Sequence, residues 1–521
     1  MLPLPRILIA VLPLLLMAAC FAAFAPAADQ AQWGELHSRN IVFAEKGLPE
    51  TFDPGTRNKE GNIDLLPNSG VRWVARLGNT SYGSPVVAGG RVFAGTNNDM
   101  PRDGRMQGDR GVLMCFDEKT GEYLWQLCLP KLTKIKWSDW QLIGITSPPT
   151  VEGDRAYLVS NRGEVMCLDV RGMADGNQGP FTDEGRLMAD EGQPPLTPGP
   201  KDADILWMFD MPARLNVTPH NGSNCSVLLH GDLLYICTSQ GVDWTHKYVP
   251  HPEAPSVIVL DKNTGRLAAR DDFGIGPDVT HGQWSSVAMG MVKAKPQMFF
   301  AAGNGVVYAF EPLADRREAA ETSPSGPARL KNLWRFHGHP LAQKQDPPPA
   351  DHQHDSTTYQ VTAMPVFHKD RLYVTFTQEP HHNMKLGHLA CIDATKTGDA
   401  TQSALVWSYD KIGSGESTVA IADGLVYATG FDGRLHCLDA DTGKCYWIHE
   451  AGAQVWASPL VADGKLYLGS GGKQTLWVLA TGREPKVLRQ IRMRDGIYST
   501  VTAANGTLLV MTNKHLYAVG K

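Results

Sequence analysis

The stretch Leu435-His436-Cys437-Leu438-Asp439-Ala440-Asp441-Thr442-Gly443-Lys444-Cys445-Tyr446-Trp447 decides the fold of this chain. It predicts a strand that ends in Leu-Asp, a tight turn on Asp-Thr-Gly and a second strand that carries the tryptophan. The Asp accepts hydrogen bonds from backbone N–H groups two residues on, and the Gly takes the positive φ that the turn requires. The pattern returns at 115–125, 259–265, 391–398 and, in weaker form, 479–482. This recurrence indicates a repeat protein.

Each repeat contains four predicted strands, A to D. Strand A typically reads Ser-Pro-Val, strand B is apolar and usually contains tyrosine, strand C ends in Leu-Asp and strand D carries the tryptophan. Trp407 and Trp447 lie 40 residues apart, which is the period of a four-stranded propeller blade. The unit can be followed eight times, with strand A near residues 84, 147, 225, 285, 364, 417, 458 and 499.

The two ends of the chain complement each other. The eighth repeat stops after its strand C at 515–519, and the first repeat strand, at 71–77, is a lone strand D. We therefore expect an all-β fold over residues 71–521, an eight-bladed β-propeller of four-stranded antiparallel blades. The N-terminal strand would join the C-terminal blade and close the ring, which removes exposed sheet edges.

The repeated motif Leu-Asp-Ala-x-Thr-Gly-x-x-x-Trp resembles the pyrroloquinoline quinone (PQQ)-like β-propeller repeat family. One branch of that family comprises quinoprotein dehydrogenases, which bind PQQ and calcium and oxidise alcohols or sugars. Another comprises outer-membrane-assembly lipoproteins, which bind proteins and are not catalytic. Dehydrogenases of the family often carry a vicinal disulfide, and this sequence has no adjacent cysteines and no Cys-x-x-Cys-His haem motif. The resemblance implies the fold, and it leaves both functions open.

Residues 1–28 are predicted to be an export signal, because Arg6 precedes an apolar run and then small residues. Three fates remain open: cleavage at Ala25-Pro26-Ala27, lipidation at Cys20, or retention as an uncleaved anchor. Residues 29–70 are a polar N-terminal extension that we expect to lie across the fold. The protein is thus expected to be exported to the periplasm or cell envelope, with membrane contact only through such an anchor. The formal net charge of −5, without a basic run, disfavours nucleic-acid binding.

The nine cysteines of an exported chain raise the question of disulfides. Cys115, Cys167, Cys391 and Cys437 share a repeat position that elsewhere holds valine or alanine, which favours small buried side chains. Bridges between Cys437 and Cys445, or between Cys115 and Cys128, remain the alternative.

A ligand site is predicted from the register of strand A. Strands A line the central channel of a propeller, so the residue just before each Ser-Pro-type pair should face the channel mouth. Aromatic and polar side chains there could stack a planar ring and bond its edges, or the aromatics could simply fill the space between blades. The cofactor-binding candidates are Trp284, Trp456, Tyr82, Tyr498, Asn224 and Glu416, and the other two mouth positions are Thr146 and Thr362.

Histidines supply the metal-site candidates. Loops of the fifth blade hold His352, His354, His381 and His382 with neighbouring acids, which could bind Zn²⁺ or form a solvated surface. His220 and His281 each precede a strand A, and either acid–base or ligand chemistry or ordinary hydrogen bonding would suit them.

Two functions follow from these patterns. The first is a non-catalytic exported propeller whose loop face binds an envelope protein or a small-molecule ligand. The second is a quinoprotein-type alcohol or sugar dehydrogenase that holds PQQ and calcium at the channel mouth.

Overall fold

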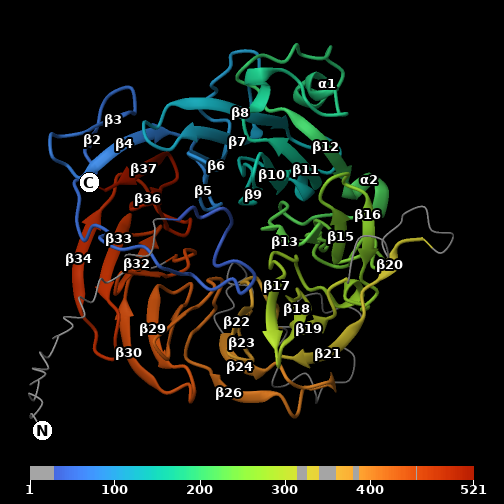
Figure 1. Cartoon of the computed structure of the whole chain (residues 1–521), viewed down its shortest axis with the longest axis vertical. Coiled ribbons are helices and arrows are strands. Elements are labelled where there is room, and N and C mark those ends of the chain that lie inside the picture. The colour runs from blue at the N-terminus through green and yellow to red at the C-terminus, as the bar shows by residue number, and fades with distance from the viewer. Residues whose placement is uncertain (1–27, 314–325, 339–358, 379–386, 453, 521) are drawn as a thin grey trace, which may run out of the picture.

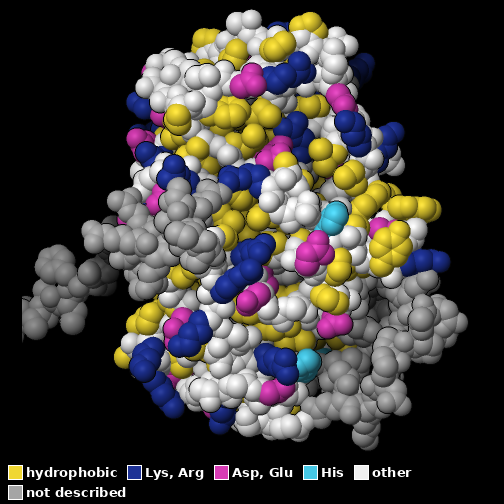
Figure 2. Space-filling model, turned by 90° about the vertical axis from the view of Figure 1, so that its right-hand side faces the viewer, with side chains coloured by type: hydrophobic (Ala, Val, Ile, Leu, Met, Phe, Trp, Pro, Cys, Tyr) yellow, Lys and Arg dark blue, Asp and Glu magenta, His cyan; other side chains and the backbone are white. Residues whose placement is uncertain are grey.

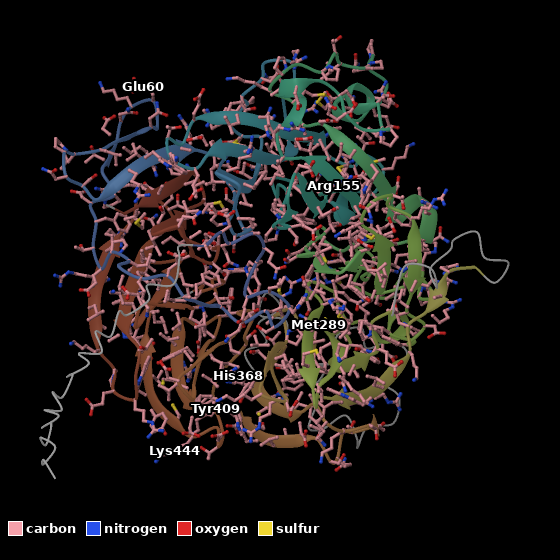
Figure 3. All side chains as sticks on the ribbon, in the orientation of Figure 1. Glu60, Arg155, Met289, His368, Tyr409 and Lys444 are labelled. Atoms are coloured by element: carbon pink, nitrogen blue, oxygen red, sulfur yellow. The ribbon has the colours of Figure 1, made fainter. Side chains whose placement is uncertain are left out.

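A computed structural model describes residues 28–313, 326–338, 359–378, 387–452 and 454–520. It confirms the predicted eight-bladed, all-β propeller, whose sheets stand around a central axis (Figure 1). The inner strands lie near the axis and the C–D turns lie at the rim, as Met289 and Lys444 show (Figure 3). Residues 1–27 of the predicted export signal lie outside the described residues.

Blades 1 to 4 follow one another along the chain, each with its strands A to D in order from the axis outward. Their strands are β5 (Val86–Ala88), β6 (Arg91–Asn97), β7 (Arg110–Asp117) and β8 (Tyr123–Pro130); β9 (Thr150–Glu152), β10 (Arg155–Val159), β11 (Glu164–Asp169) and β12 (Ile205–Asp210); β13 (Leu228–His230), β14 (Leu233–Cys237), β15 (Val257–Asp261) and β16 (Leu267–Arg270); and β17 (Ala288–Val292), β18 (Lys295–Ala301), β19 (Val306–Phe310) and β21 (Asn332–His337).

Blades 5 to 8 repeat this order, and the last one borrows its strand D from the N-terminal part of the chain. Their strands are β22 (Val366–His368), β23 (Arg371–Thr377), β24 (Gly387–Asp393) and β26 (Leu405–Tyr409); β27 (Ala420–Ala422), β28 (Leu425–Thr429), β29 (Arg434–Asp439) and β30 (Cys445–Glu450); β31 (Leu460–Ala462), β32 (Lys465–Ser470), β33 (Thr475–Ala480) and β34 (Val487–Arg492); and β35 (Thr502–Ala504), β36 (Thr507–Met511), β37 (His515–Val519) and β4 (Val71–Arg76).

Short elements supplement the blades. Strand β1 (Val42–Phe43) pairs with the inner edge of blade 7, and β20 (Ala328–Arg329) and β25 (Gly398–Asp399) pair with the outer edges of blades 3 and 4. A hairpin of β2 (Thr56–Arg57) and β3 (Ile63–Asp64) lies outside the ring. Within the described residues there are two α-helices, each of about one turn, α1 (Glu184–Met188) and α2 (Met211–Leu215). None of the helices in the described ranges combines the length and apolar character needed to cross a bilayer.

The ring closes as the sequence predicted. Strand β37 pairs antiparallel with β4, and Leu516 lies opposite Ala75 while Ala518 lies opposite Trp73. The first and last repeat strands therefore belong to one sheet, and blade 8 exists only when both ends of the propeller sequence are present.

The repeated turn has the predicted chemistry. In blade 6, one carboxylate oxygen of Asp439 accepts hydrogen bonds from the backbone N–H groups of Asp441 (3.1 Å) and Thr442 (3.0 Å) and from the Thr442 hydroxyl (3.0 Å). Gly443 takes a φ of +70°. Strand C pairs with strand D through a one-residue irregularity just before the Leu-Asp pair, here between Cys437 and Leu438.

The strand D tryptophan joins each of several blades to the next one. The indole N–H of Trp407 in blade 5 donates to the carbonyl of Ala440 in blade 6 (3.0 Å), and its ring lies against Gly443 of the same turn. Equivalent contacts link Trp73 to Gly121, Trp125 to Gly172 and Trp207 to Gly265. The glycine is thus required twice, for its positive φ and for the close approach of the neighbouring ring. Blade 4 differs, since Trp334 donates within its own blade and pairs with Gly398 of β25 instead.

The N-terminal segment 28–45 crosses the channel at the end of the strands A away from the predicted mouth (Figure 1). It hydrogen-bonds to all eight blades. Backbone carbonyls of this segment accept from the amides of Val87, Val151, Met289, Phe367, Val461 and Asn505, the Asn40 side chain pairs with both backbone groups of Ile421, and Arg39 contacts Ser226. We call residues 28–45 the channel plug.

Arg39 anchors the channel plug to blades 3 and 4. Its side chain is fully buried and donates to the carbonyls of Val287 (2.9 Å), Trp33 (3.1 Å) and Ser226 (2.8 Å) and to the Ser226 hydroxyl (3.1 Å). Burial lowers the pKa of the Arg39 guanidinium to about 10, so it stays charged at neutral pH. The charge is held by neutral oxygen acceptors, a costly arrangement that is offset because each of the three guanidinium nitrogens donates a hydrogen bond.

The eight cysteines of the described residues are free thiols, and all but the half-buried Cys445 are buried. The alternative bridges Cys437–Cys445 and Cys115–Cys128 are therefore not formed. On the side of the ring shown in Figure 2, Lys and Arg alternate with Asp and Glu and gather into no single-sign patch.

We expect Gly443→Ala to destabilise the ring by about 3 kcal/mol, because a Cβ there would stand 2.6 Å from Cε3 of Trp407 in addition to the strain of its positive φ. Gly424→Ala is the matched control, since Gly424 lies in another turn of the same blade with φ +75° and open space around it. It should cost only about 1 kcal/mol. Urea unfolding of both variants measures the difference, and equal losses would show that the ring contact does not constrain the glycine.

Arg39→Met should lower the free energy of unfolding by about 3 kcal/mol, because it leaves buried carbonyls without donors. It should also speed hydrogen exchange at the amides of Met289, Phe367 and Val461, which bond to the channel plug. The exposed Arg489, whose only described bond goes to the carbonyl of Leu488, supplies the control Arg489→Met. Wild-type protection in Arg39→Met would contradict the anchoring role.

Candidate functional site

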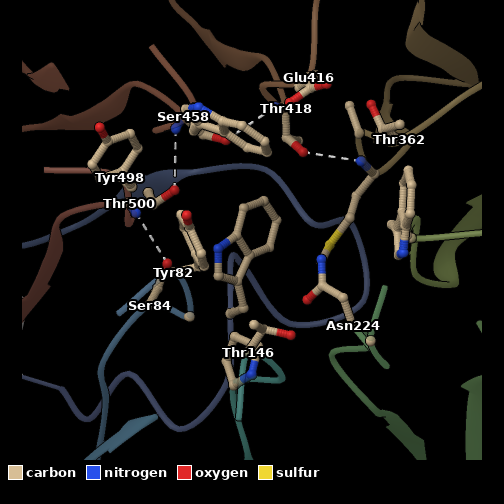
Figure 4. A pocket seen from close by; sticks show the side chains of 18 of the residues that line it. Tyr82, Ser84, Thr146, Asn224, Thr362, Glu416, Thr418, Ser458, Tyr498 and Thr500 are labelled. Atoms are coloured by element: carbon tan, nitrogen blue, oxygen red, sulfur yellow. Dashed lines mark hydrogen bonds between the residues drawn. The ribbon is translucent and has the colours of Figure 1, made fainter. Parts of the chain in front are cut away.

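The channel mouth contains a cavity of about 450 Å³. All eight residues predicted from the strand A register line it, one from each blade: Tyr82, Thr146, Asn224, Trp284, Thr362, Glu416, Trp456 and Tyr498 (Figure 4). The structure thus brings the predicted mouth residues together around one space. That they bind a cofactor stays a prediction.

Three of the aromatic side chains contact one another across blades 7, 8 and 1. The ring of Tyr82 lies 5.9 Å from that of Trp456 and 5.7 Å from that of Tyr498, centroid to centroid. Burial raises the pKa of the Tyr82 hydroxyl, so this group is a neutral donor at physiological pH. These aromatic rings could both fill the space between blades and stack on a ligand, because the same rings pack between blades and face the cavity.

The cavity has a floor and a rim that the sequence analysis did not assign. Trp33 of the channel plug lines it from below, so the extension contributes directly to the site. Trp140, in the loop between β8 and β9, lines it and is 46% exposed. No periodic signal marks either tryptophan, since both lie outside the repeat.

A chain of hydroxyl contacts holds the inner strands in place around the cavity. The amide of Met364 donates to Thr418, that of Thr418 to Ser458, that of Ser458 to Thr500 and that of Thr500 to Ser84, over distances of 3.0–3.1 Å (Figure 4). These bonds run from blade 5 through to blade 1. The recurring Ser or Thr of strand A therefore links neighbouring blades, a role that its repetition alone did not reveal.

The opposite wall carries a cluster of histidines next to Trp284. The indole N–H of Trp284 donates to the carbonyl of His220 (3.2 Å), and its ring lies 4.9 Å from that of His281. His246, from the loop between β14 and β15, completes the cluster, with ring centroids 4.7 Å from His220 and 4.8 Å from His281. The positions of His220 and His281 before strands A mark each of them in the sequence, whereas no motif marks His246. We call these three residues the histidine cluster.

The predicted metal ligands of blade 5 cannot be placed. His352, His354, His381 and His382 all lie outside the described residues. Their metal binding remains a prediction.

Among curated proteins, the chain matches two quinone-dependent alcohol dehydrogenases over short segments. It is 36% identical over 101 residues to the dehydrogenase subunit of alcohol dehydrogenase (quinone) from Gluconobacter oxydans, covering 15% of this chain and 13% of the relative. It is 31% identical over 110 residues to quinohemoprotein alcohol dehydrogenase ADH-IIG from Pseudomonas putida, covering 16% and 15%. The matches span less than a sixth of either relative, too little to transfer an activity.

Two solved structures share the fold across nearly the whole chain. BamB from Moraxella catarrhalis aligns with a TM-score of 0.50 and 11% identity, over 87% of this chain and 97% of that one. A europium-containing methanol dehydrogenase aligns with a TM-score of 0.57 and 11% identity, over 95% and 98%. At this identity the likeness is one of fold.

The family model described as outer membrane protein assembly factor BamB matches residues 109–331 and 331–485, which is more than half of the chain. The match covers most of the propeller and agrees with the eight blades seen in the structure. The chain belongs to this family of PQQ-like propellers.

Proposed function

We propose that this chain is an exported, non-catalytic propeller of the cell envelope that binds a neutral or cationic ring in its channel mouth. The ring belongs either to a small molecule or to a side chain of an envelope protein. The observation that carries the proposal is the described lining of the cavity, which has six aromatic residues (Trp or Tyr) and a single carboxylate. They are Trp33, Tyr82, Trp140, Trp284, Trp456 and Tyr498, with Glu416 as the carboxylate.

Charge decides the class of ligand. No lysine or arginine is among the described residues that line the cavity, and Glu416 is their only acidic side chain. Aromatic faces carry partial negative charge, so they attract cations, and they also stack on neutral rings. An anionic ligand would meet the carboxylate of Glu416 and the ring faces, and no described lysine or arginine of the lining would offset their charge.

The face around the cavity suits a protein partner. Loops D–A and B–C lie on the same face of the propeller, and they carry exposed apolar side chains beside the mouth. Trp244 is 70% exposed and Tyr248 62% exposed in the B–C loop of blade 3, and Leu142 is 52% exposed in the loop that precedes blade 2. Aromatic residues are favoured in protein interfaces. The family description supports an envelope role for such a surface.

The alternative is a quinoprotein-type oxidoreductase that holds PQQ and calcium, which the short matches to quinone-dependent alcohol dehydrogenases favour. The described lining does not fit that group. PQQ carries three carboxylates, and no described lysine or arginine lines the cavity to receive them. Calcium takes six to eight oxygen ligands, whereas Glu416 and Asn224, the predicted polar partners, stand on blades 6 and 3 of the ring.

Binding of benzyltrimethylammonium, a ring with a fixed positive charge, tests the proposal. Calorimetric titration should show one site per chain, and Trp456→Ala and Glu416→Gln should each weaken it about tenfold, because they remove a ring face and the only carboxylate. Trp244→Ala is the control, since Trp244 is exposed and is not part of the lining. Near-UV circular dichroism checks that the variants keep their fold.

The same titration with PQQ and Ca²⁺ separates the two functions. We expect no change in the quinone absorbance and no dye reduction when alcohols are added. PQQ binding that depends on Trp456, together with alcohol-dependent turnover, would replace the binding-protein proposal with the oxidoreductase.

A further inference from the structure

We propose that His220, His246 and His281 bind one divalent transition-metal ion of the Zn²⁺ type at the channel mouth. This inference goes beyond the proposed function and does not depend on it, since it concerns residues in the wall of the cavity and not the ligand proposed to bind inside the cavity.

The three side chains come from three loops that converge on one face. His220 lies in the D–A loop before β13, His246 in the B–C loop between β14 and β15, and His281 in the D–A loop before β17. One ring nitrogen from each lies within 4.8 Å of the other two. Zn–N bonds of about 2.0–2.1 Å in a tetrahedral site would bring these nitrogens to about 3.3 Å from one another. Small side-chain rotations therefore suffice to complete the site.

The orientation of His220 is that of a metal ligand. Its Nδ1–H donates to the carbonyl of Val242 at 2.8 Å, which fixes the tautomer and leaves Nε2 as the nitrogen able to bind a metal. The Nε2 atoms of His220 and His281 are both buried. Metal-binding histidines commonly donate their other ring N–H to a carbonyl in this way.

The backbone between the loops holds the ligands close together. The amide of Val242 donates to the carbonyl of His281 at 2.8 Å, so residue 242 bridges the segments of both buried histidines. Gly241 makes the approach feasible, because a Cβ there would stand 2.6 Å from Cβ of His220 and 2.7 Å from the carbonyl oxygen of His281. The cluster is thus built into the fold and does not depend on one mobile side chain.

Two of the three histidines are buried, and the third is partly exposed, so that a metal ion could reach the cluster from solvent. His220 is 1% exposed and His281 5% exposed, whereas His246 is half-buried on the loop that also carries the exposed Trp244. Imidazole nitrogens suit Zn²⁺, Cu²⁺ and Ni²⁺. Three protein ligands leave the fourth tetrahedral position for water or another ligand, and because His281 and Trp284 line the cavity, the ion would border the cavity.

Zn²⁺ alone is the probe for the test. The full exported chain, stripped with a chelator, is titrated by calorimetry and then with Co²⁺, whose visible absorption reports a tetrahedral site. We expect the wild type to bind one Zn²⁺ ion per chain. The affinity for Zn²⁺ should be at least tenfold lower in His246→Gln, and binding should be lost in the double variant His220→Gln/His246→Gln. His251→Gln is the matched control, because His251 is a half-buried histidine in the same B–C loop and lies outside the cluster.

Thermal unfolding gives a second readout that does not need activity. Saturating Zn²⁺ should raise the melting temperature of the wild type and of His251→Gln, and it should raise that of the double variant less or not at all. Equal zinc affinity in His246→Gln and His251→Gln, or no Zn²⁺ binding by the folded wild type, would overturn the proposal. Loss of benzyltrimethylammonium binding with zinc binding intact would remove only the proposed function.

Discussion

The contact between a strand D tryptophan and the glycine turn of the next blade sets the geometry of this molecule. Where the contact forms, the indole donates to a carbonyl of the neighbouring turn and its ring lies against the glycine, as Trp407 does with Ala440 and Gly443. Because the contact joins successive blades at the rim, it fixes their separation and their angle. The inner strands and their loops are then held at regular intervals around the axis, and the ring of mouth residues follows from that spacing.

The inner edge of each blade is held by a different chemistry. Hydroxyls of Ser and Thr accept backbone amides from the adjacent strand A, and the channel plug adds hydrogen bonds to all eight blades at the far end. Neighbouring blades are thus linked by tryptophan–turn contacts at the rim and by hydroxyl–amide hydrogen bonds near the axis.

Much of this structure was predictable from sequence because it depends on a repeat. The motif at 435–447, its copies and the split last blade predicted the number of blades, the closure by β4 and the eight residues that line the cavity. What escaped prediction lies where periodicity ends. Trp33 and Arg39 belong to an extension with no repeat, and His246 lies in a loop of irregular length. His220, His246 and His281 meet only because three loops converge on one face, which sequence spacing does not encode.

Blade 4 shows how the fold tolerates a departure from its own rule. The turn of blade 5 carries an additional residue, and its glycine, Gly398, pairs through the backbone with Trp334 in β21 and does not lie against the indole ring. Two parallel backbone pairings take the place of the indole contact. The spacing of the blades is thus kept in every repeat, whereas the contact that maintains this spacing differs between blades.

The channel plug also has a consequence for how the protein is made. Residues 28–45 are synthesised before all of the blades, yet their partners include Val461 and Asn505, and β4 needs β37. Neither the plug nor blade 8 has its binding surface until synthesis is nearly finished. The channel plug therefore lacks several of its native contacts until late in synthesis, and closure of the ring follows translation of the last blade. A chain whose ring is still open can be threaded through a narrow translocation pore.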